Sequence, residues 1–298
     1  MELNLLSFIP LIARKQNIQE TEAAVKYFII QAVGRGLILT AGIMSVTISP
    51  AQTYYTTINL IFILRMLIKL GVAPCHQWLP RVIARLNWPI CLLLATWQKL
   101  SPLIILRVLA PRNIPALITF IAVLRAIIGG IGGVNQAQLR PLLAYSSIGH
   151  IGWIIIAIEI EITLLLLYLA VYITITFSLI LLIIQTNKIS SNFDNSLLPI
   201  STPIFLILIT IMFRLGGLPP LLGFAPKWFI ISILTAKHIF ITILILICGR
   251  LINLFYYFNI SFNFIILTKT PKKSTPYIPT SVIFSTIICT IAPIILYL

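Results

Sequence analysis

Long apolar stretches, broken at intervals by proline and glycine, leave this sequence few folds to adopt. The clearest example is Phe213–Ile231, which reads F-R-L-G-G-L-P-P-L-L-G-F-A-P-K-W-F-I-I and holds three prolines and three glycines. Each proline removes a backbone donor, and lipid offers nothing to replace the lost hydrogen bond. Such an interruption must therefore be buried in protein or face water.

Lys227 follows this interruption directly, and Trp228 and another apolar run come after it. Placing a lysine within a membrane costs roughly 2.5 to 3.5 kcal/mol on insertion scales, so an intramembrane lysine is a functional-site hypothesis by default. The alternative is a lysine at a helix end whose ammonium group reaches the membrane surface. From this stretch alone, both interpretations stay open.

Composition places the whole chain in the membrane. Of its 298 residues, 59% are hydrophobic and 9% are charged, whereas soluble domains carry about 25% charged residues. Several runs approach the ~20 residues that a spanning helix needs, and the strict alternation of a β-barrel is absent. We predict an all-α, polytopic transmembrane bundle of about 10 helices, forming one integral membrane domain over residues 1–298, with its last span at Ser281–Leu298.

Charge and cysteine usage exclude other classes. The net charge is +15, but lysines and arginines are scattered singly among apolar runs, so we expect no nucleic-acid partner. Cys75, Cys91, Cys248 and Cys289 lack metal-ligand spacing, which indicates small packing residues and no metal site. The opening M-E-L-N-L-L-S-F-I-P has neither a basic region nor a cleavage site, so we expect no cleaved signal.

Two connecting segments also carry expectations. Trp78 and Trp88, close to Arg81 and Arg85, predict a short interfacial helix anchored at the level of the lipid headgroups. The glycines of Gly129–Asn135, G-G-I-G-G-V-N, predict a flexible connector between two spans.

Lysines recur beside helix interruptions. Lys69, Lys99 and Lys227 each lie close to a proline in an apolar segment. Transporters use pairs of broken helices to place polar backbone and titratable groups at the membrane midplane, whereas a chain built only to anchor would not need them. An amine that has lost its hydration can change protonation state near physiological pH. The recurrence therefore predicts proton loading and release at these lysines.

The run L-L-A-Y-S-S-I-G-H-I-G-W adds a polar stripe to an apolar helix. Ser146 and His150 are separated by one helical turn, and Tyr145 and Ser147 lie on adjacent faces. A lone histidine is often a satisfied core residue, and that interpretation stays open. Hydroxyls and an imidazole on one face can also hold a chain of water, so the stripe favours a relay that links His150 to the lysines.

Six motifs resemble one family. They are T-E-A-A-V-K-Y-F, I-K-L-G-V-A-P-C-H-Q-W-L-P, T-W-Q-K-L-S-P, G-G-V-N-Q-A-Q-L-R, A-Y-S-S-I-G-H-I-G-W and L-G-G-L-P-P-L-L-G-F-A-P-K-W. In this order, over nearly the whole chain, they resemble the NADH dehydrogenase subunit 2 family, the antiporter-like, proton-pumping subunits of mitochondrial respiratory complex I.

The resemblance implies a core subunit of the membrane arm, multi-pass in the mitochondrial inner membrane, that translocates protons while other subunits pass electrons from NADH to ubiquinone. It implies that this chain carries no redox centre and binds no cofactor, because flavin, iron-sulfur clusters and quinone belong to other subunits. The implied partners are the other complex I membrane-arm subunits and membrane lipids.

The resemblance also assigns roles. By motif, Lys99 matches the family's central broken-helix lysine and Lys227 the lysine of its later broken helix. Lys69 and His76 match a further lysine and histidine of less settled role. Glu2 matches an intramembrane glutamate that would tune Lys99 electrostatically.

Two departures from the family pattern bear on these roles. The chain begins one residue before Glu2, whereas the family has a preceding span, so we expect either a start recorded too late or a lost first helix. The family often has Arg-Lys where this chain has Arg140-Pro141. Because arginine does not readily give up its proton, His150 and water would cover more of the path, or passage from Lys99 to Lys227 would differ.

Three classes of function remain at this point. The ordered match favours a complex I pump subunit. A free-standing cation/proton antiporter would share the broken-helix lysines, and the departures at Glu2 and Arg140-Pro141 keep a non-pumping structural subunit open.

Overall fold

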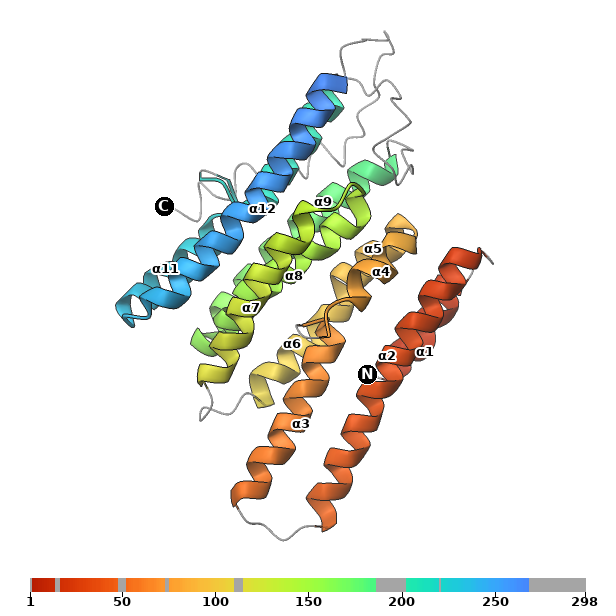
Figure 1. Ribbon diagram of the computed structural model, residues 1–298, viewed down its shortest axis with the longest axis vertical. Helices are drawn as coiled ribbons and strands as arrows, with labels where there is room; N and C mark the ends of the chain where they lie inside the picture. Colours follow the sequence, from red (N-terminus) through yellow and green to blue (C-terminus); the bar gives the residue numbers. More distant parts are fainter. Residues whose placement is uncertain are drawn as a thin grey trace.

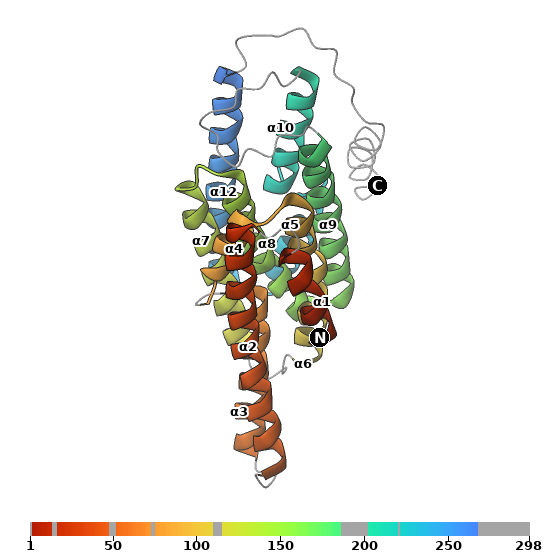
Figure 2. The ribbon, with the colours of Figure 1, turned by 90° about the vertical axis from the view of Figure 1, so that its right-hand side faces the viewer.

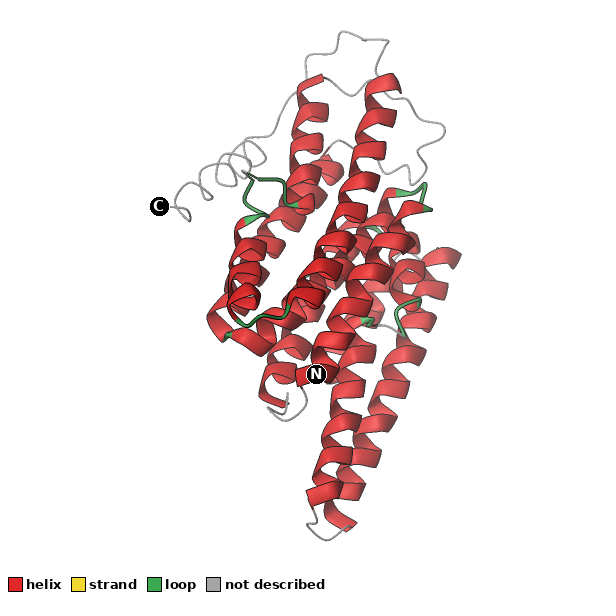
Figure 3. Ribbon diagram, turned by 60° about the vertical axis from the view of Figure 1, so that its left-hand side comes forward, coloured by secondary structure: helices red, strands yellow, loops and turns green. Residues whose placement is uncertain are grey.

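The computed structural model describes residues 2–13, 17–47, 52–72, 75–109, 115–185, 202–219 and 221–267. The regular structure in this part of the chain is helical, as Figure 3 shows. Its 12 helices are α1 (Glu2–Ile12), α2 (Ile18–Thr47), α3 (Gln52–Leu70), α4 (Trp78–Arg85), α5 (Trp88–Ala95), α6 (Trp97–Leu109), α7 (Pro115–Val134), α8 (Leu139–Ile160), α9 (Ile162–Gln185), α10 (Thr202–Gly216), α11 (Ala225–Ala236) and α12 (Phe240–Leu267). The expected span at Ser281–Leu298 lies outside the described residues.

Within these ranges, five stretches are long and apolar enough to cross a membrane: α2, α5 together with α6, α8, α9 and α12. The prediction of an all-α transmembrane bundle is thereby confirmed. The described residues form 12 helices, and one apolar stretch, Trp88–Val108, is divided into α5 and α6. That the whole chain forms one domain stays a prediction.

Helix α8 is the central element of the bundle. In Figure 1, α7, α8 and α9 lie in the middle, with α11 and α12 on one side and α1 and α2 on the other. Figure 2 shows α2 and α3 reaching farthest at one end, and α10 and α12 at the other. Since α8 packs against α4, α6, α7, α9, α11 and α12, it is buried along nearly its whole length.

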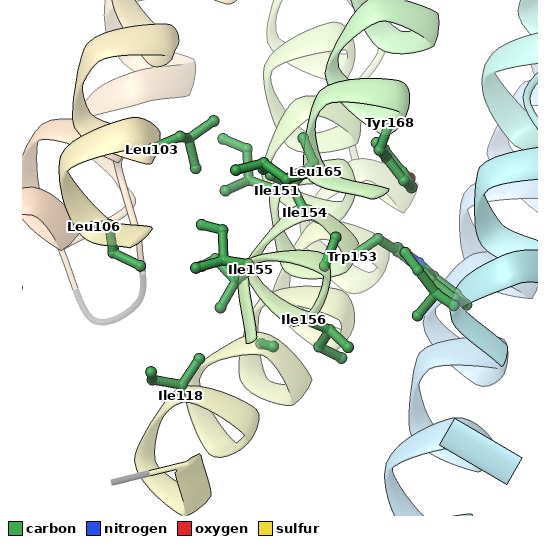
Figure 4. Close-up of a cluster of buried hydrophobic side chains, with 14 of the residues drawn as sticks. Leu103, Leu106, Ile118, Ile151, Trp153, Ile154, Ile155, Ile156, Leu165 and Tyr168 are labelled. Atoms are coloured by element: carbon green, nitrogen blue, oxygen red, sulfur yellow. The ribbon is translucent and has the colours of Figure 1, made fainter. Parts of the chain in front are cut away.

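The core around α8 follows from its sequence. Ile151, Ile154, Ile155 and their neighbours make this helix apolar on every side, and a helix of that kind is stable only when it is surrounded. Figure 4 shows these side chains packed between α6, α7 and α9. Any polar group on α8 is therefore held deep in the bundle.

The expected connector at Gly129–Asn135 is wrong, because α7 continues to Val134. A Cβ atom at Gly129 would lie 2.6 Å from the backbone nitrogen of Gly149 on α8, and one at Gly249 on α12 would lie 2.6 Å from the Ala126 oxygen. The glycines let three helix backbones approach closely, which is a common use of small residues between membrane helices.

The expected short helix is present as α4, but the expected anchoring of the tryptophans at the headgroups is wrong. Trp78 and Trp88 are buried instead of exposed as anchors, and α4 packs against α2 and α8. The Trp78 indole Nε1 donates to the Ile68 carbonyl, 3.2 Å away, near the end of α3. The indole thus satisfies a backbone acceptor inside the protein instead of facing headgroups.

Candidate functional site

Each lysine that the sequence singled out lies at a helix interruption, as predicted. Lys69 is in the last turn of α3, before the turn that leads to α4. Lys99 is in the first turn of α6, after the break from α5, and Lys227 is in the first turn of α11, after the break from α10. Glycine stands at the breaks beside Lys69 and Lys227, whereas the break beside Lys99 precedes α6 and Pro102 lies inside that helix.

The break after α10 has a defined backbone structure. Gly217 has a φ of 76°, which favours glycine, and its N–H donates to the Arg214 oxygen at 3.0 Å. The N–H of Leu218 donates to the Phe213 oxygen at 3.3 Å. These two bonds form a Schellman motif, which ends the helix and leaves its last carbonyls available to other donors.

Lys227 supplies a donor to that helix end. Its side chain is 4% exposed, so it does not reach the surface, and its Nζ atom lies 3.3 Å from both the Leu215 and Gly216 oxygens. A cation at a helix C-terminus also interacts favourably with the helix dipole. The alternative of a lysine that extends to the membrane surface is therefore excluded for the described structure.

The break beside Lys99 occurs at Thr96, whose Oγ1 atom donates to the Leu92 oxygen at 2.7 Å. Lys99 is 4% exposed, and its Nζ atom donates to the Tyr172 hydroxyl at 3.2 Å. Tyr172 belongs to α9. A phenol oxygen is thus the described partner of this ammonium group, and it can donate its own proton onward.

The polar stripe predicted on α8 is buried. Ser146, Ser147 and His150 face the interior, and Tyr145 is half-buried. The serine hydroxyls donate to carbonyls one turn back on α8, so their oxygen lone pairs remain to accept other donors. His150 Nδ1 lies 3.0 Å from the hydroxyl of Tyr168 on α9.

His150 lies between the two lysine sites. Its ring centroid is 5.2 Å from that of Tyr172, the partner of Lys99. The Leu215 carbonyl, which accepts from Lys227, lies near His150. The positive charges that act electrostatically on His150 are those of Lys227, Lys99 and Arg250. The structure thus brings both lysines to one imidazole.

A small internal cavity connects Lys69 with Lys99. Its volume is about 10 Å³, close to the minimum for one water molecule, and its polar side chains provide the partners that such a water needs. The lining residues are Tyr27, Gln31, Lys69, Leu70, Trp78, Leu79, Leu94, Gln98 and Lys99.

The other residues predicted for the site lie away from this cluster or have side chains that the structure does not describe. Glu2 begins α1, but its side chain is outside the described part, so its pairing with Lys99 stays a prediction. His76 lies half-buried in the turn before α4. Arg140 is in the first turn of α8, about 15 Å along the helix axis from His150, where it donates to the Ala84 oxygen at 3.5 Å.

Sequence reasoning missed four residues of this region: Arg125 on α7, Arg250 on α12, and Tyr168 and Tyr172 on α9. Each arginine is the single charged residue of its apolar helix, and that signal was sufficient to mark it as a candidate. The tyrosines are one turn apart in an uncharged helix, a pattern that looks like ordinary core. Nothing local identified them.

Among the described residues, no group of three or more His, Cys, Asp or Glu side chains is placed to hold a metal ion. Cys91 is buried, as a packing residue should be, but Cys75 and Cys248 are exposed, so the packing interpretation is wrong for those two. Cys289 lies outside the described residues.

These features define a class. A multi-pass helical membrane bundle that buries cations at helix breaks, next to phenol and imidazole groups and a small cavity, has the architecture of an ion- or proton-translocating protein.

A comparison with known protein families identifies the family of this chain. Residues 1–253 match the family described as NADH:quinone oxidoreductase/Mrp antiporter, transmembrane, and the chain belongs to this family.

Relatives and solved structures agree with this assignment. NADH-ubiquinone oxidoreductase chain 2 of Lumbricus terrestris is 39% identical over 262 residues, covering 87% of this chain and 77% of the relative. The protein of the same name from Saccopteryx leptura is 38% identical over 314 residues, covering 99% and 89%. A chain of respiratory complex I from Thermus thermophilus with bound aureothin has a TM-score of 0.78 at 22% identity, covering 98% of this chain and 69% of that one. A chain of the Mrp complex from Dietzia sp. DQ12-45-1b has a TM-score of 0.76 at 15% identity, covering 87% and 53%.

Proposed function

We propose that this chain is a proton-translocating subunit in the membrane arm of an NADH:ubiquinone oxidoreductase of the mitochondrial inner membrane. The observation that carries the proposal is the buried cluster of Lys99, Tyr172, His150 and Lys227, in which Lys99 donates to Tyr172 and the Tyr172 ring packs against His150. The names of the relatives supply the enzyme to which the subunit would belong.

The described groups alternate between proton donors and acceptors. Lys99 donates to a phenol oxygen, which is able to pass a proton on after rotation of its hydroxyl. His150 can take up a proton on one ring nitrogen and release one from the other, after which a ring flip or a second proton exchange restores the starting tautomer. Lys227 ends the described connection, with its ammonium group held by carbonyls.

Lys69 extends this connection on the other side of Lys99. The cavity that both lysines line has room for about one water molecule, which would bridge the two amines. Ionisation of the Glu2 carboxylate would change the electrostatic environment of Lys99. Because Arg140 lies at the start of α8 and contacts Ala84, the path proposed here runs through His150 without it.

In this proposal the chain performs no electron transfer. Flavin, iron-sulfur clusters and ubiquinone would be held by other subunits, and redox work there would change charges next to the relay. Coupling of that kind needs two protonation states of the relay whose relative free energy shifts when a neighbouring charge changes, and a buried charge in low dielectric responds strongly to such a change.

The test compares Lys99→Ala and Lys227→Ala with Lys237→Ala in the assembled complex, reconstituted in sealed vesicles. Lys237 lies just after the end of α11 and is exposed, so it controls for loss of a lysine without loss of a buried one. We expect both buried variants to lower the number of protons pumped per NADH oxidised and the control to leave it unchanged. Unchanged stoichiometry in both buried variants would reject the relay.

The same preparation separates the remaining classes. Co-purification of the chain with an NADH-oxidising assembly supports the proposal. A monodisperse chain that exchanges sodium for protons by itself would favour a free-standing antiporter, and an assembled complex that pumps normally without the two lysines would favour a structural subunit.

A further inference from the structure

Two buried arginines make the same contact at two distant places in the chain. Arg125 on α7 donates through Nη2 to the oxygens of Leu70 and Gly71, at 3.3 and 3.2 Å. Arg250 on α12 donates through Nε to the Gly216 oxygen at 3.3 Å and through Nη2 to the Gly217 oxygen. In each case the acceptors are the last residue of a helix and the glycine that follows it.

The two helix ends share one backbone motif. Gly71 and Gly217 both have positive φ, at 65° and 76°. At the end of α3, the N–H groups of Gly71 and Val72 donate to the Ile68 and Leu67 oxygens, at 3.0 and 2.8 Å. The end of α10 has the equivalent pair of bonds, so both helices close with a Schellman motif and both leave the carbonyls that the arginines bind.

Each arginine also lies near one relay lysine. Arg250 and Lys227 share the Gly216 oxygen as an acceptor, and Leu70, whose oxygen Arg125 binds, lines the same cavity as Lys99. Each arginine therefore binds the carbonyl end of a helix near one relay lysine, and Arg250 also lies over the Phe224 ring, 5.1 Å from its centroid.

Capping of the helix ends does not by itself account for arginine at these positions. Two carbonyls can be satisfied by a neutral amide, which has two donors, whereas burying a guanidinium removes a permanent charge from water at a large cost. Arg125 is fully buried, and its Nε and Nη1 atoms have no hydrogen-bond partner among the described residues. The feature that only arginine adds is a fixed positive charge.

We propose that Arg125 and Arg250 are positioning residues of the relay: each holds the carbonyl end of an interrupted helix and places a permanent positive charge beside one titratable lysine, Lys99 or Lys227. The inference rests on the proposed function. It adds that each lysine works against a fixed like charge, which keeps the two protonation states of the lysine close in free energy and lets a small external change switch them.

The test separates charge from hydrogen bonding. In the assembled complex, Arg125→Gln and Arg250→Gln keep donors for the carbonyls but remove the charge, and Arg125→Lys and Arg250→Lys supply a cation that is titratable instead of permanent. We expect each glutamine variant to pump protons about tenfold more slowly than the parent complex at every pH with assembly intact, and each lysine variant to stay within about twofold at low pH and to slow as the pH rises. Rescue by lysine but not by glutamine is a result that a purely structural cap would not give.

Arg107→Gln is the matched control. Arg107 on α6 donates through Nη1 to the Ile158 carbonyl near the end of α8, but it is half-exposed and lies two turns beyond Lys99. We expect its replacement to leave pumping unchanged. A loss as large as that of Arg125→Gln would contradict the specific role of the two buried arginines.

Three outcomes would overturn the inference: glutamine variants that pump normally, glutamine and lysine variants that are equally impaired, or glutamine variants that fail to assemble while lysine variants pump fully. The last would assign the arginines to folding alone. A double variant, Arg125→Gln with Lys99→Ala, should pump no worse than Lys99→Ala alone, because the arginine acts through that lysine. Normal pumping by Lys99→Ala and Lys227→Ala would instead reject the proposed function itself.

Discussion

Lys227 and Lys99 are buried to the same extent, but their ammonium groups are held in different ways. The acceptors of Lys227 are backbone oxygens 11 and 12 residues away in the chain, across the break that precedes it. The acceptor of Lys99 is the phenol of Tyr172, which is 73 residues away on another helix. The first site is thus built largely by one local segment, and the second exists only when α6 and α9 are packed together.

The helix ends at Gly71 and Gly217 give a second comparison, because the backbone motif is the same and the surroundings differ. A Cβ atom at Gly71 would meet the Leu79 side chain at 3.3 Å. One at Gly217 would meet the Gly223 oxygen at 2.9 Å and Lys227 Nζ at 3.0 Å. The backbone at the Gly217 break packs closely against its lysine, Lys227, whereas no described lysine lies close to Gly71 in this way.

The largest expected effect is that of Gly217→Ala. The new methyl group combines a left-handed backbone with contacts to a carbonyl and to the Lys227 amine, so we expect about 3 kcal/mol of lost stability and loss of pumping. The measurement is the thermal inactivation midpoint of the purified complex. Gly36→Ala is the control, since no atom lies within 4 Å of a Cβ at that position, and it should not lower the midpoint.

Tyr172→Phe tests the site that depends on packing. Without the hydroxyl, the buried Lys99 loses its described acceptor, a change that costs about 2 kcal/mol and corresponds to about a thirtyfold slower pumping rate. Proton uptake by sealed vesicles during NADH oxidation measures it. Tyr145→Phe on α8 should pump normally, and equal pumping by the two variants would show that the hydroxyl of Tyr172 is not needed.

Gly71→Ala should have a smaller effect than Gly217→Ala. Its backbone strain is similar, but only Leu79 Cβ, at 3.3 Å, lies closer than ordinary van der Waals contact, so a small shift at the start of α4 accommodates the methyl group and we expect about 1.5 kcal/mol of lost stability. The same inactivation midpoint compares the two variants directly. If Gly71→Ala lowers the midpoint as much as Gly217→Ala, the closer packing around Gly217 has no effect on stability.

Tyr168→Phe should have the smallest effect. It removes one hydrogen bond to His150, worth about 1 kcal/mol, or about a fivefold change in pumping rate. Because Tyr172 keeps its place between Lys99 and His150, the connection itself remains. A loss larger than that of Tyr172→Phe would move the main path from Tyr172 to Tyr168.

The sequence by itself determined the class and the positions of the breaks. Hydrophobicity over about 20 residues is a local property, and so is the effect of proline and glycine on the chain, so a helical membrane bundle with Lys69, Lys99 and Lys227 beside interruptions was predictable. The motifs were also sufficient to find the family. Local reasoning failed at Gly129, where the same residue type serves close packing between helices instead of a turn.

Only the tertiary structure decided which groups meet. Nothing near Lys99 in the sequence points to Tyr172, nothing near Gly71 points to Arg125, and the burial of Trp78 depends on α2 and α8 packing around α4. The physical reason is that a hydrogen bond between distant residues depends on how the helices pack, whereas the preferences that a sequence displays act within a few residues.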